Sequence, residues 1–539
     1  MTPHPYSLMS RFCFGFAAVL LPCLFLSLYD EPQATAHSCS MGFFLTFLTS
    51  VLIGVVLRRQ TQKKQNLFLR KQAILMVVLI WLGASCIGAM PYFFSGILKS
   101  PIDALFESVS GFTTTGCSIL APKVYDPKGN FEITYVKKSP MDPDHTHTYY
   151  GTVEPFQASN GKIKEGIQAL PRALILWRGL TQWLGGGGIV ALFLTLVPLA
   201  GVGNKVLFQS EVTGPSKEGL TPRVKETARI LWKTYLSLSL LQLITTLSLI
   251  PNINWFDSLT LMLSTVSTGG FGSYGSSIAH YQNARLEWIL MPFMLMGSIN
   301  FYLFFHLVKG RFHKVFDIEL MVFLFIVIVG ILGGSYFLQE HSIQFLTGET
   351  KRLSSLDTLR TWAFHYISLL TSTGFATANY DLWPTALQMI LLVSMYIGGM
   401  SGSTTGGTKV IRVYILIRYC FYRLKNLLQP ETVESFRLHG HEIEPSTVSL
   451  VLVFFGFVAL STLTGTFFYV LDGLDLESSF SFTACCLNNT GQAFRLLGPT
   501  ESCAILSSAS KLMACFQMLL GRLEYFTLLM VMIPAFYRK

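Results

Sequence analysis

The stretch Glu107-Ser-Val-Ser-Gly-Phe-Thr-Thr-Thr-Gly116 decides the fold, because the Thr-Gly pair that ends it returns three more times along the chain. A long apolar helix candidate precedes each pair, and another follows it. The segment that ends in each pair is too short to span a bilayer. Four copies of helix, short re-entrant segment, glycine-bearing loop and helix predict one pore wrapped by a single polypeptide, which indicates ion permeation rather than catalysis. The four pairs are Thr115-Gly116, Thr268-Gly269, Thr373-Gly374 and Thr490-Gly491.

The composition is that of a membrane protein. Of 539 residues, 51% are hydrophobic and only 13% are charged, whereas soluble domains carry about 25% charged residues. The formal net charge of +10 does not indicate nucleic-acid binding, because Lys and Arg stand in short runs between apolar segments. No basic stripe is interleaved with aromatic residues. We therefore predict an all-α polytopic membrane protein that does not bind nucleic acid.

Ten apolar runs are candidates to cross the hydrocarbon core, which takes about 20 residues per helix. The first two form a plain N-terminal transmembrane hairpin, and the other eight form four pairs, each around one Thr-Gly site. The candidate spans are Phe12–Leu28, Met41–Leu57, Ala73–Phe94, Ala173–Leu199, Ile230–Ile250, Ile289–Val308, Leu320–Leu338, Ala386–Leu424 (interrupted), Val448–Leu471 and Leu506–Tyr537. The expected units are 1–70 for the hairpin and its basic linker, 71–204 for repeat 1 with an extracellular insertion at 121–165, 205–316 for repeat 2, 317–430 for repeat 3 and 431–539 for repeat 4.

Positive charge sets the topology. Every junction between repeats is basic, so the positive-inside rule places all the junctions in the cytoplasm. The Thr-Gly loops must then enter from the outside, as part of a multi-pass membrane protein. The junction residues are Arg58, Arg59, Lys63, Lys64, Arg70 and Lys71, then Lys205, Lys217, Arg223, Lys225 and Arg229, then Lys309, Arg311 and Lys314, and finally Arg418, Arg423 and Lys425.

The N-terminus has two interpretations. The run Phe12–Leu28, followed by Ala34-Thr35-Ala36, has the order of a cleavable signal peptide. The run is also as long as a membrane span, and a second span follows at once. We favour retention, and cleavage after Ala36 would leave the topology downstream unchanged.

The Thr-Gly loops suit an ion-selective filter. Backbone carbonyls replace the hydration shell of a cation, and glycine tolerates the backbone angles that turn consecutive carbonyls toward an axis. The threonine adds a hydroxyl and packs β-branched bulk behind the loop. Irregular backbone at membrane depth survives only when it is buried in protein or lines a watery cavity. The short helices before the loops would aim their partly negative carboxyl ends at the pore, which favours cations.

A second feature is the stretch Gly398-Gly-Met-Ser-Gly-Ser-Thr-Thr-Gly-Gly-Thr-Lys409, which interrupts an apolar helix. Its glycine and hydroxyl residues cannot hold a straight helix well, so we expect an intramembrane loop at 398–408. Gly402 and Gly407 have the spacing of a nucleotide-binding loop, but Gly-Thr-Lys stands where Gly-Lys-Ser/Thr is required, and no strand is predicted before it. A passive packing kink is one interpretation of this break.

The third feature is Arg522, within the last apolar segment. A charge at that depth is costly and usually faces a watery cavity or a partner. An ion pair with Glu524 and snorkelling to the interface are the structural alternatives. For Arg178, at the outer start of a helix, we expect interfacial anchoring together with Trp177 and Trp183.

These motifs resemble the Trk/Ktr/HKT potassium transporter superfamily, most closely its bacterial TrkH-type uptake subunits, over nearly the whole chain. The matching motifs are Glu107-to-Gly116 for the first filter, Trp177-Arg-Gly-Leu-Thr-Gln-Trp-Leu-Gly-Gly186 for the helix after it, and Leu220-Thr-Pro-Arg-Val-Lys-Glu-Thr-Ala-Arg229 for a cytoplasmic junction. The fourth filter departs from the pattern with Gln492-Ala493 after its glycine, and the second leaves a choice between Gly269 and Gly270.

The resemblance implies a fold of four pseudo-repeats, each helix, re-entrant pore helix with filter loop, and helix, around one pore. It implies that the glycines of the four pairs bind potassium together with their threonines, and Gly116 favours potassium over sodium. It also implies a gate below the filter, formed by Gly402, Ser403, Thr404, Thr405, Gly406, Gly407 and Arg522. Expected partners are a second copy in a homodimer and a cytosolic nucleotide-binding regulatory ring of the TrkA type at the basic junctions. No covalent cofactor is expected, and potassium is the substrate.

Three other interpretations stand beside this one. A potassium-translocating subunit of a Kdp-type ATP-driven pump shares the filter plan, but the N-terminal hairpin and the Gly402–Gly407 break favour the Trk type. An intramembrane enzyme needs clustered acids and histidines at one membrane face, and a structural scaffold needs no filter loops. Asp142, Asp144, His145 and His147 in the insertion, and His439 to Glu442 in the last linker, have metal-binding residue types without a spacing that fixes ligands. Channel-like and ion-coupled transport are not distinguished.

Overall fold

The structure is a computed structural model that describes residues 5–30, 39–61, 70–126, 131–138, 146–157, 161, 163–188, 224–339, 341–429, 436–438 and 441–538. Several expectations concern residues outside these ranges. They are the cleavage point at Ala36, the linker basic residues Lys63, Lys64, Lys205, Lys217 and Arg223, the second half of the span Ala173–Leu199, the candidate ligands Asp142, Asp144 and His145, and His439.

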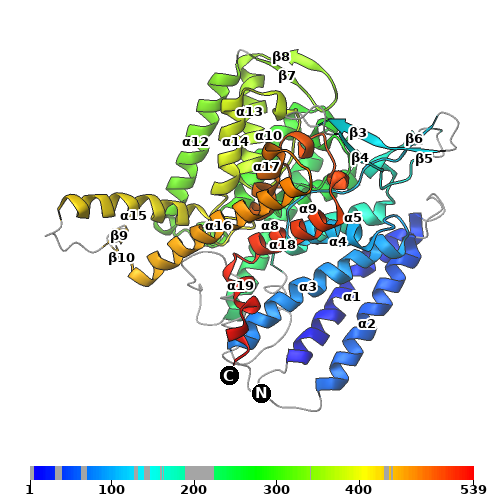
Figure 1. The fold of residues 1–539 in the computed structure, drawn as a ribbon, viewed down its shortest axis with the longest axis horizontal. Coiled ribbons are helices and arrows are strands. Elements are labelled where there is room, and N and C mark those ends of the chain that lie inside the picture. Colours follow the sequence, from blue (N-terminus) through cyan, green and yellow to red (C-terminus); the bar gives the residue numbers. More distant parts are fainter. Residues whose placement is uncertain are drawn as a thin grey trace.

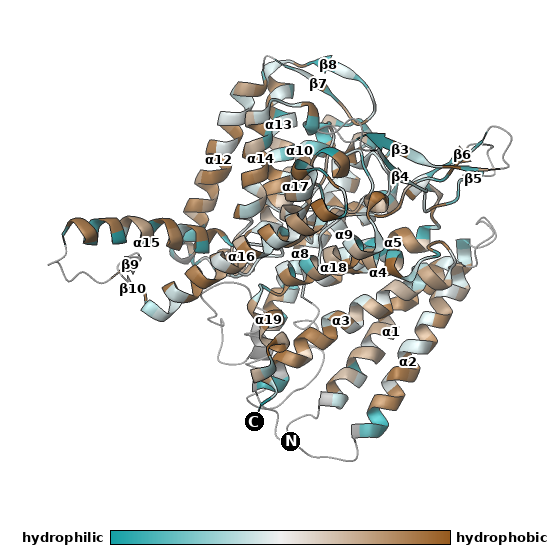
Figure 2. Cartoon of the chain, viewed as in Figure 1, coloured by the Kyte–Doolittle hydropathy of each residue, from teal (hydrophilic) through white to brown (hydrophobic). Residues whose placement is uncertain are grey.

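Within the described residues, six helices are long and apolar enough to cross a membrane, and Figure 2 shows hydrophobic residues along their length. Two of them, α1 (Pro5–Asp30) and α2 (Cys39–Thr61), form the predicted N-terminal hairpin. The other four are α3 (Arg70–Phe94), α8 (Val224–Leu249), α12 (Ile318–Leu338) and α16 (Pro445–Leu471). Each of these four begins one repeat, so the mainly helical, four-repeat fold expected from the sequence is confirmed (Figure 1).

A short helix follows each of these four spans. The short helices are α4 (Pro101–Phe112), α9 (Trp255–Val266), α13 (Ser355–Leu370) and α17 (Leu476–Asn488). They have 12 to 16 residues, which at about 1.5 Å per residue is too short for a hydrocarbon core of about 30 Å. Each leads into one Thr-Gly site, so they are the predicted re-entrant segments.

The four short helices begin in the same way. The N-cap residues Ser100, Asn254, Ser354 and Asp475 each accept a backbone hydrogen bond through the side chain, and an acidic residue follows in each first turn. Both features stabilise the amino end of a helix, where the dipole is positive. The opposite, partly negative ends therefore all lie at the Thr-Gly sites.

The second helix of the repeats is broken more often than the sequence predicted. The break in Ala386–Leu424 is present, between α14 (Thr385–Ile397) and α15 (Val410–Leu428). The span Ile289–Val308, predicted as continuous, divides into α10 (Ala284–Ser298) and α11 (Phe301–Val308), which meet at 99°. The span Leu506–Tyr537 divides into α18 (Ser508–Arg522) and α19 (Phe526–Met532), which meet at 120°.

Each unexpected break has a local cause. Asn300 starts α11 by accepting a hydrogen bond from the backbone N–H of Tyr302, 3.0 Å away. Glu524 and Tyr525 have positive φ angles of 52° and 62°, which a right-handed helix cannot contain. In the first repeat the second helix, α5, is Arg172–Gly186, and the described part of this segment continues to residue 188.

The repeats close into a ring. The second helix of each repeat packs against the short helix of the next, in the pairs α5 with α9, α10 with α13, and α14 with α17. In the fourth repeat α18 packs against α4 of the first. A chain with four similar units has therefore joined its end to its beginning, and the four Thr-Gly sites face one common axis.

Small antiparallel hairpins cover one end of the bundle. The insertion at 121–165 forms β1 (Val124–Tyr125) with β2 (Glu132–Ile133), β3 (Tyr135–Lys138) with β4 (Thr146–Tyr149), and β5 (Phe156–Gln157) with β6 (Ile163–Lys164). β7 (Ser342–Gln344) and β8 (Thr350–Arg352) lie toward the same end (Figure 1). The linker before α16 holds β9 (Arg437–Leu438) and β10 (His441–Glu442).

Candidate functional site

The four filter turns share one backbone pattern of three successive positions. The first, which we call the inner position, has a φ of 53° or 54° and is held by Thr114, Thr268, Ser372 and Asn489. The second, the middle position, is held by Thr115, Gly269, Thr373 and Thr490, each of which donates its backbone N–H to the carbonyl five residues earlier. The third, the outer position, has a φ between 78° and 90° and is held by Gly116, Gly270, Gly374 and Gly491.

This pattern corrects the register predicted for the second repeat. By backbone angle and hydrogen bonding, the equivalent of Gly116 is Gly270, and Gly269 occupies the position that threonine has in the other repeats. Thr268 is then at the inner position. The sequence pair Thr268-Gly269 looked equivalent to the other pairs because two glycines follow one another there, and only the backbone angles show which one takes the left-handed conformation.

The outer glycines join the four turns into a ring. A Cβ built on any of them would lie under 3.0 Å from the middle carbonyl oxygen of the next repeat. The contacts run from Gly116 to Gly269, from Gly270 to Thr373, from Gly374 to Thr490 and from Gly491 to Thr115. Any side chain at these positions would push the filter turns of adjacent repeats apart. Both the positive φ and the close approach therefore require glycine.

The ring has the chemistry of a cation site. Four neutral carbonyl oxygens stand at the seams between adjacent filter strands, and the carboxyl ends of the four short helices are directed at them. Carbonyl dipoles and helix carboxyl ends both favour a positive ion. Nine of the twelve residues at the three positions are buried, and the threonines among them are 0% exposed. The partly exposed residues are Gly116, Gly270 and Gly491.

Repeats 1 and 3 match each other most closely. The hydroxyls of Thr113 and Thr115 lie 2.7 Å apart, and those of Thr371 and Thr373 lie 2.8 Å apart. In the fourth repeat, the side-chain amide of Asn489 donates to the Thr115 hydroxyl at 2.8 Å. The four-fold symmetry of the backbone is therefore broken by the side chains behind it.

A buried ion pair braces the outer side of the filter, and it overturns the expectation that Arg178 is an interfacial anchor. Arg178 is 1% exposed, and its Nε donates to Glu107 Oε1 at 2.8 Å. Arg178 also donates to the carbonyl of Gly272 at 3.0 Å, while Glu107 accepts from the backbone N–H of Ile119 at 3.0 Å. The pair thus connects the chain segments that follow the first and second filters.

The stretch 398–409, which we call the gate loop, lies directly under the inner position. It follows helix α14 rather than a strand, which removes the structural context of a nucleotide-binding loop. The Thr404 hydroxyl is 3.2 Å from that of Thr268, and the Gly406 N–H donates to Ser372 Oγ at 3.3 Å. A Cβ on Gly406 would meet Asn489 Oδ1. The loop therefore contacts three of the four inner residues.

Arg522 supplies the fourth contact. Its guanidinium donates to the hydroxyl of Thr114 at 3.2 Å and to the carbonyl of Thr404 at 2.5 Å. A further bond, also 2.5 Å, reaches the carbonyl of Gly185 at the end of α5. Glu524, the predicted structural partner of Arg522, forms an ion pair with Arg412 of α15. Arg522 thus connects the gate loop, the first filter and α5.

Two buried charges hold the ends of the gate loop. The amine of Lys409, at 0% exposure, donates to the Thr405 carbonyl and lies 3.2 Å from the Thr405 hydroxyl. Glu319, at the start of α12, accepts from the Ser401 N–H at 2.7 Å. The sequence analysis did not single out either residue, although a lysine at the end of a glycine-rich break and an acid at the start of an apolar helix are visible in it.

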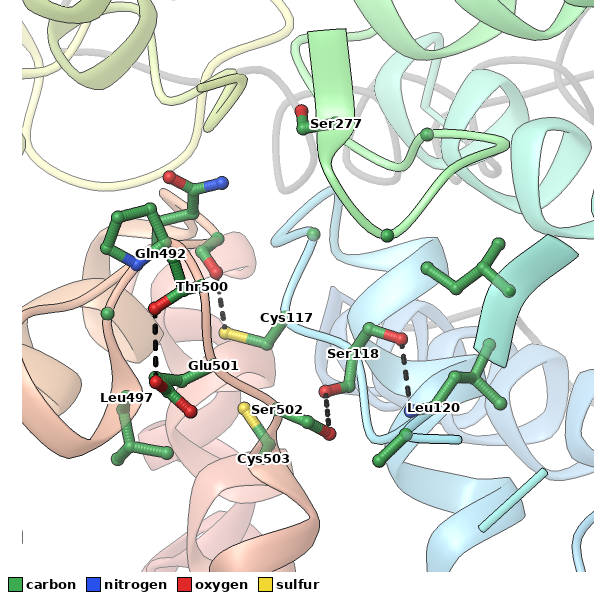
Figure 3. A pocket seen from close by; sticks show the side chains of 18 of the residues that line it. Cys117, Ser118, Leu120, Ser277, Gln492, Leu497, Thr500, Glu501, Ser502 and Cys503 are labelled. Atoms are coloured by element: carbon green, nitrogen blue, oxygen red, sulfur yellow. Dashed lines mark hydrogen bonds between the residues drawn. The ribbon is translucent and has the colours of Figure 1, made fainter. Parts of the chain in front are cut away.

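The other side of the filter opens into a cavity of about 430 Å³. Gly116, Gly270 and Gly491 line its floor, and residues of the first filter exit and of the loop after the fourth filter form its walls. Figure 3 shows Cys117 and Ser118 on one side of this cavity and Gln492 and Thr500 to Cys503 on the other. The cavity is large enough to hold several water molecules beside the outer glycines.

Known proteins resemble this chain in sequence and in overall fold. The model of the TrkH family, described as a cation transport protein, matches residues 128–536. The potassium uptake protein TrkH of Salmonella typhimurium is 30% identical over 97% of this chain and 96% of its own length. The TrkH of Halomonas elongata is 30% identical over 97% of each chain. The crystal structure of the potassium transporter TrkH from Vibrio parahaemolyticus superposes with a TM-score of 0.77 at 27% identity, covering 99% of both chains.

Proposed function

This chain belongs to the TrkH family of cation transport proteins, and from that membership we propose that it carries potassium ions into the cell across the bacterial cytoplasmic membrane. The observation that supports this function most directly is the closed ring of outer glycines against middle carbonyls. A dehydrating cation needs several neutral oxygens at once, and this ring supplies one from each repeat. The family and its named relatives favour this function over a Kdp-type pump subunit.

Potassium enters from the outer cavity and loses its water at the filter. We propose that the outer and middle positions bind it, namely Gly116, Gly270, Gly374 and Gly491 with Thr115, Gly269, Thr373 and Thr490. Thr268, which the sequence placed among the binding residues, acts from the inner position. The ion is the substrate, and the mechanism requires no covalent cofactor and no bond-making step.

The gate loop and Arg522 obstruct the path below the filter. Together they contact all four inner residues, so an ion that leaves the filter meets the loop at once. The positive charge of Arg522 adds an electrostatic barrier to a cation in the low-dielectric surroundings. Conduction then requires the loop to move away from Thr268, Ser372 and Asn489, with Gly402, Ser403, Thr405 and Gly407 as the residues that permit the movement.

We propose that a partner controls this movement. α15 begins at the end of the gate loop and projects sideways from the bundle (Figure 1). It exposes apolar residues that include Phe421, Leu427 and Leu428, beside basic residues such as Arg418 and Arg423. This surface suits a second copy of the chain in a homodimer and a cytosolic nucleotide-binding regulatory ring of the TrkA type.

The experiment that tests the function is potassium uptake in a bacterial strain that lacks its own uptake systems, comparing wild type with Gly116→Ser. Wild type should restore growth at low potassium, and the variant should lose discrimination against sodium. Wild-type protein that reaches the membrane without cation flux, both alone and with its cognate cytosolic subunit, would contradict the proposal.

A further inference from the structure

The second repeat lacks a side chain at the middle position of the filter. The other three repeats have Thr115, Thr373 and Thr490 there, whereas the second has Gly269. Gly269 is not among the residues with positive φ, so its backbone does not require glycine. The absence of a side chain therefore needs another explanation.

Gln182, on the helix α5 behind the filter, occupies the vacant space. A Cβ built on Gly269 would lie 2.5 Å from Gln182 Cδ and 2.9 Å from Gln182 Cβ. Gln182 is 0% exposed. Its side chain stands where the threonine of the other repeats would begin, so glycine at 269 and glutamine at 182 fit only as a pair.

Both polar atoms of this glutamine bind the filter backbone. Nε2 donates to the carbonyl oxygen of Gly269 at 2.5 Å, and Oε1 accepts from the N–H of Phe271 at 3.1 Å. The amide thus bridges the residues on either side of Gly270. Among the described residues, the middle carbonyls of Thr115, Thr373 and Thr490 accept no side-chain hydrogen bond, so one oxygen of the ring is held differently from the other three.

We propose that Gln182 is a positioning residue that sets the potassium selectivity of the filter by holding the Gly269 carbonyl. This inference rests on the proposed potassium transport. A smaller ion such as sodium is bound well only if the carbonyls move inward. A hydrogen bond from behind opposes that movement and withdraws electron density from the oxygen, so the ring keeps a size that suits potassium.

Gln182→Leu is the first test, because leucine is similar in size and removes both hydrogen bonds. The measured quantity is the ratio of potassium to sodium uptake at matched amounts of protein in the membrane. We expect the ratio to fall by about tenfold, the factor that corresponds to one lost hydrogen bond to the backbone. A purely structural role would lower the amount of folded protein and leave this ratio unchanged.

A reciprocal exchange provides the second test. Gly269→Thr alone should abolish uptake, because its side chain would overlap Gln182. Combining Gly269→Thr with Gln182→Gly removes this overlap, including the approach of 2.9 Å to Gln182 Cβ. We expect uptake to return with a lowered ratio, because no side chain then holds the carbonyl of residue 269. If Gln182→Leu does not accumulate, the double variant still measures how the loss of the glutamine changes the ratio of potassium to sodium uptake.

Gln242→Leu is the matched control. Gln242, on α8, is also 0% exposed, and neither of its amide atoms has a hydrogen-bond partner among the described residues. The variant Gln242→Leu should leave the ratio of potassium to sodium uptake unchanged. A folded Gln182→Leu with the wild-type ratio, or a double variant that transports with the wild-type ratio, would overturn the proposal. A wild type without potassium uptake would instead contradict the proposed function itself.

Discussion

The guanidinium of Arg522 donates a hydrogen bond of 2.5 Å to the carbonyl oxygen of Thr404. Because the same guanidinium reaches Thr114, one positive side chain holds the gate loop against the innermost residue of the first filter. The closed arrangement is therefore stabilised by a contact that also places charge in the ion path, and removing that side chain should weaken both effects.

We accordingly expect Arg522→Gln to raise basal potassium flux by about tenfold, since a charge-assisted hydrogen bond and an electrostatic barrier are lost together. The measurement is rubidium flux into proteoliposomes without any regulatory protein. Arg522→Lys should give an intermediate flux, because lysine keeps the charge but not the planar fork of donors. Flux equal to that of wild type in both variants would contradict the gating role.

The corrected register of the second filter predicts different outcomes for its two glycines. Gly270→Ala forces a side chain into a φ of 80° and against the Thr373 carbonyl, so we expect potassium uptake to be abolished. For Gly269→Ala the three nearest atoms all belong to the side chain of Gln182, and this variant should keep part of the uptake. Uptake assays at equal expression compare the two, and the opposite order would restore the register predicted from the sequence.

The ion pair between Glu107 and Arg178 predicts a strong dependence of stability on both partners. Arg178→Met leaves a buried carboxylate without its cation and should destabilise the protein by about 3–5 kcal/mol. Adding Glu107→Gln removes the unpaired charge, so the double variant should recover part of that loss. Thermal unfolding of the purified protein in detergent measures both. Additive losses in the double variant would show that the two side chains act independently.

We expect the stability of the protein to depend on pH through Asp381, which lies outside the membrane-spanning segments. Burial raises the pKa of this carboxyl from its usual value to about 6, although its Oδ1 accepts from the Arg495 N–H at 3.0 Å. Between about pH 4 and 6 the folded state then holds a proton that the unfolded state has released. Stability should therefore fall as the pH rises through this range, by at most about 3 kcal/mol, and stay level above it.

Asp381→Asn keeps the acceptor oxygen and removes the titration. We expect its unfolding temperature to vary less between pH 4 and pH 7 than that of wild type, and to be higher than that of wild type at pH 7. Parallel pH profiles of the two proteins would assign the dependence to another group.

Local patterns in the sequence were sufficient to predict the four repeats, because a Thr-Gly pair after a short apolar segment involves only a few consecutive residues. The break at Gly398–Lys409 was visible for the same reason. The breaks after Ser298 and Arg522 were not, since one depends on the cap provided by Asn300 and the other on two residues with left-handed backbone angles. Composition carries no signal for either.

Contacts between segments that are far apart along the chain could not be predicted from the sequence. Glu107 and Arg178 lie 71 residues apart, and the sequence around either residue does not indicate that the two form an ion pair. The choice between Gly269 and Gly270 depends on which one touches the Thr373 carbonyl, and that contact exists only when the second and third repeats are side by side. The role of Gln182 was hidden for the same reason, within a motif that the sequence analysis had quoted.

The filter ring is encoded in a single gene with four separate codons for each layer. In a pore assembled from four identical subunits, every substitution appears four times, and the ring can change only in full steps. Here Gly269 and Thr373 already differ within one layer while the contacts around the ring remain closed. A single mutation can therefore change one of the four positions in a layer, so ion preference can change in small steps. A lineage can adjust its cation uptake in this way while the contacts around the ring remain closed.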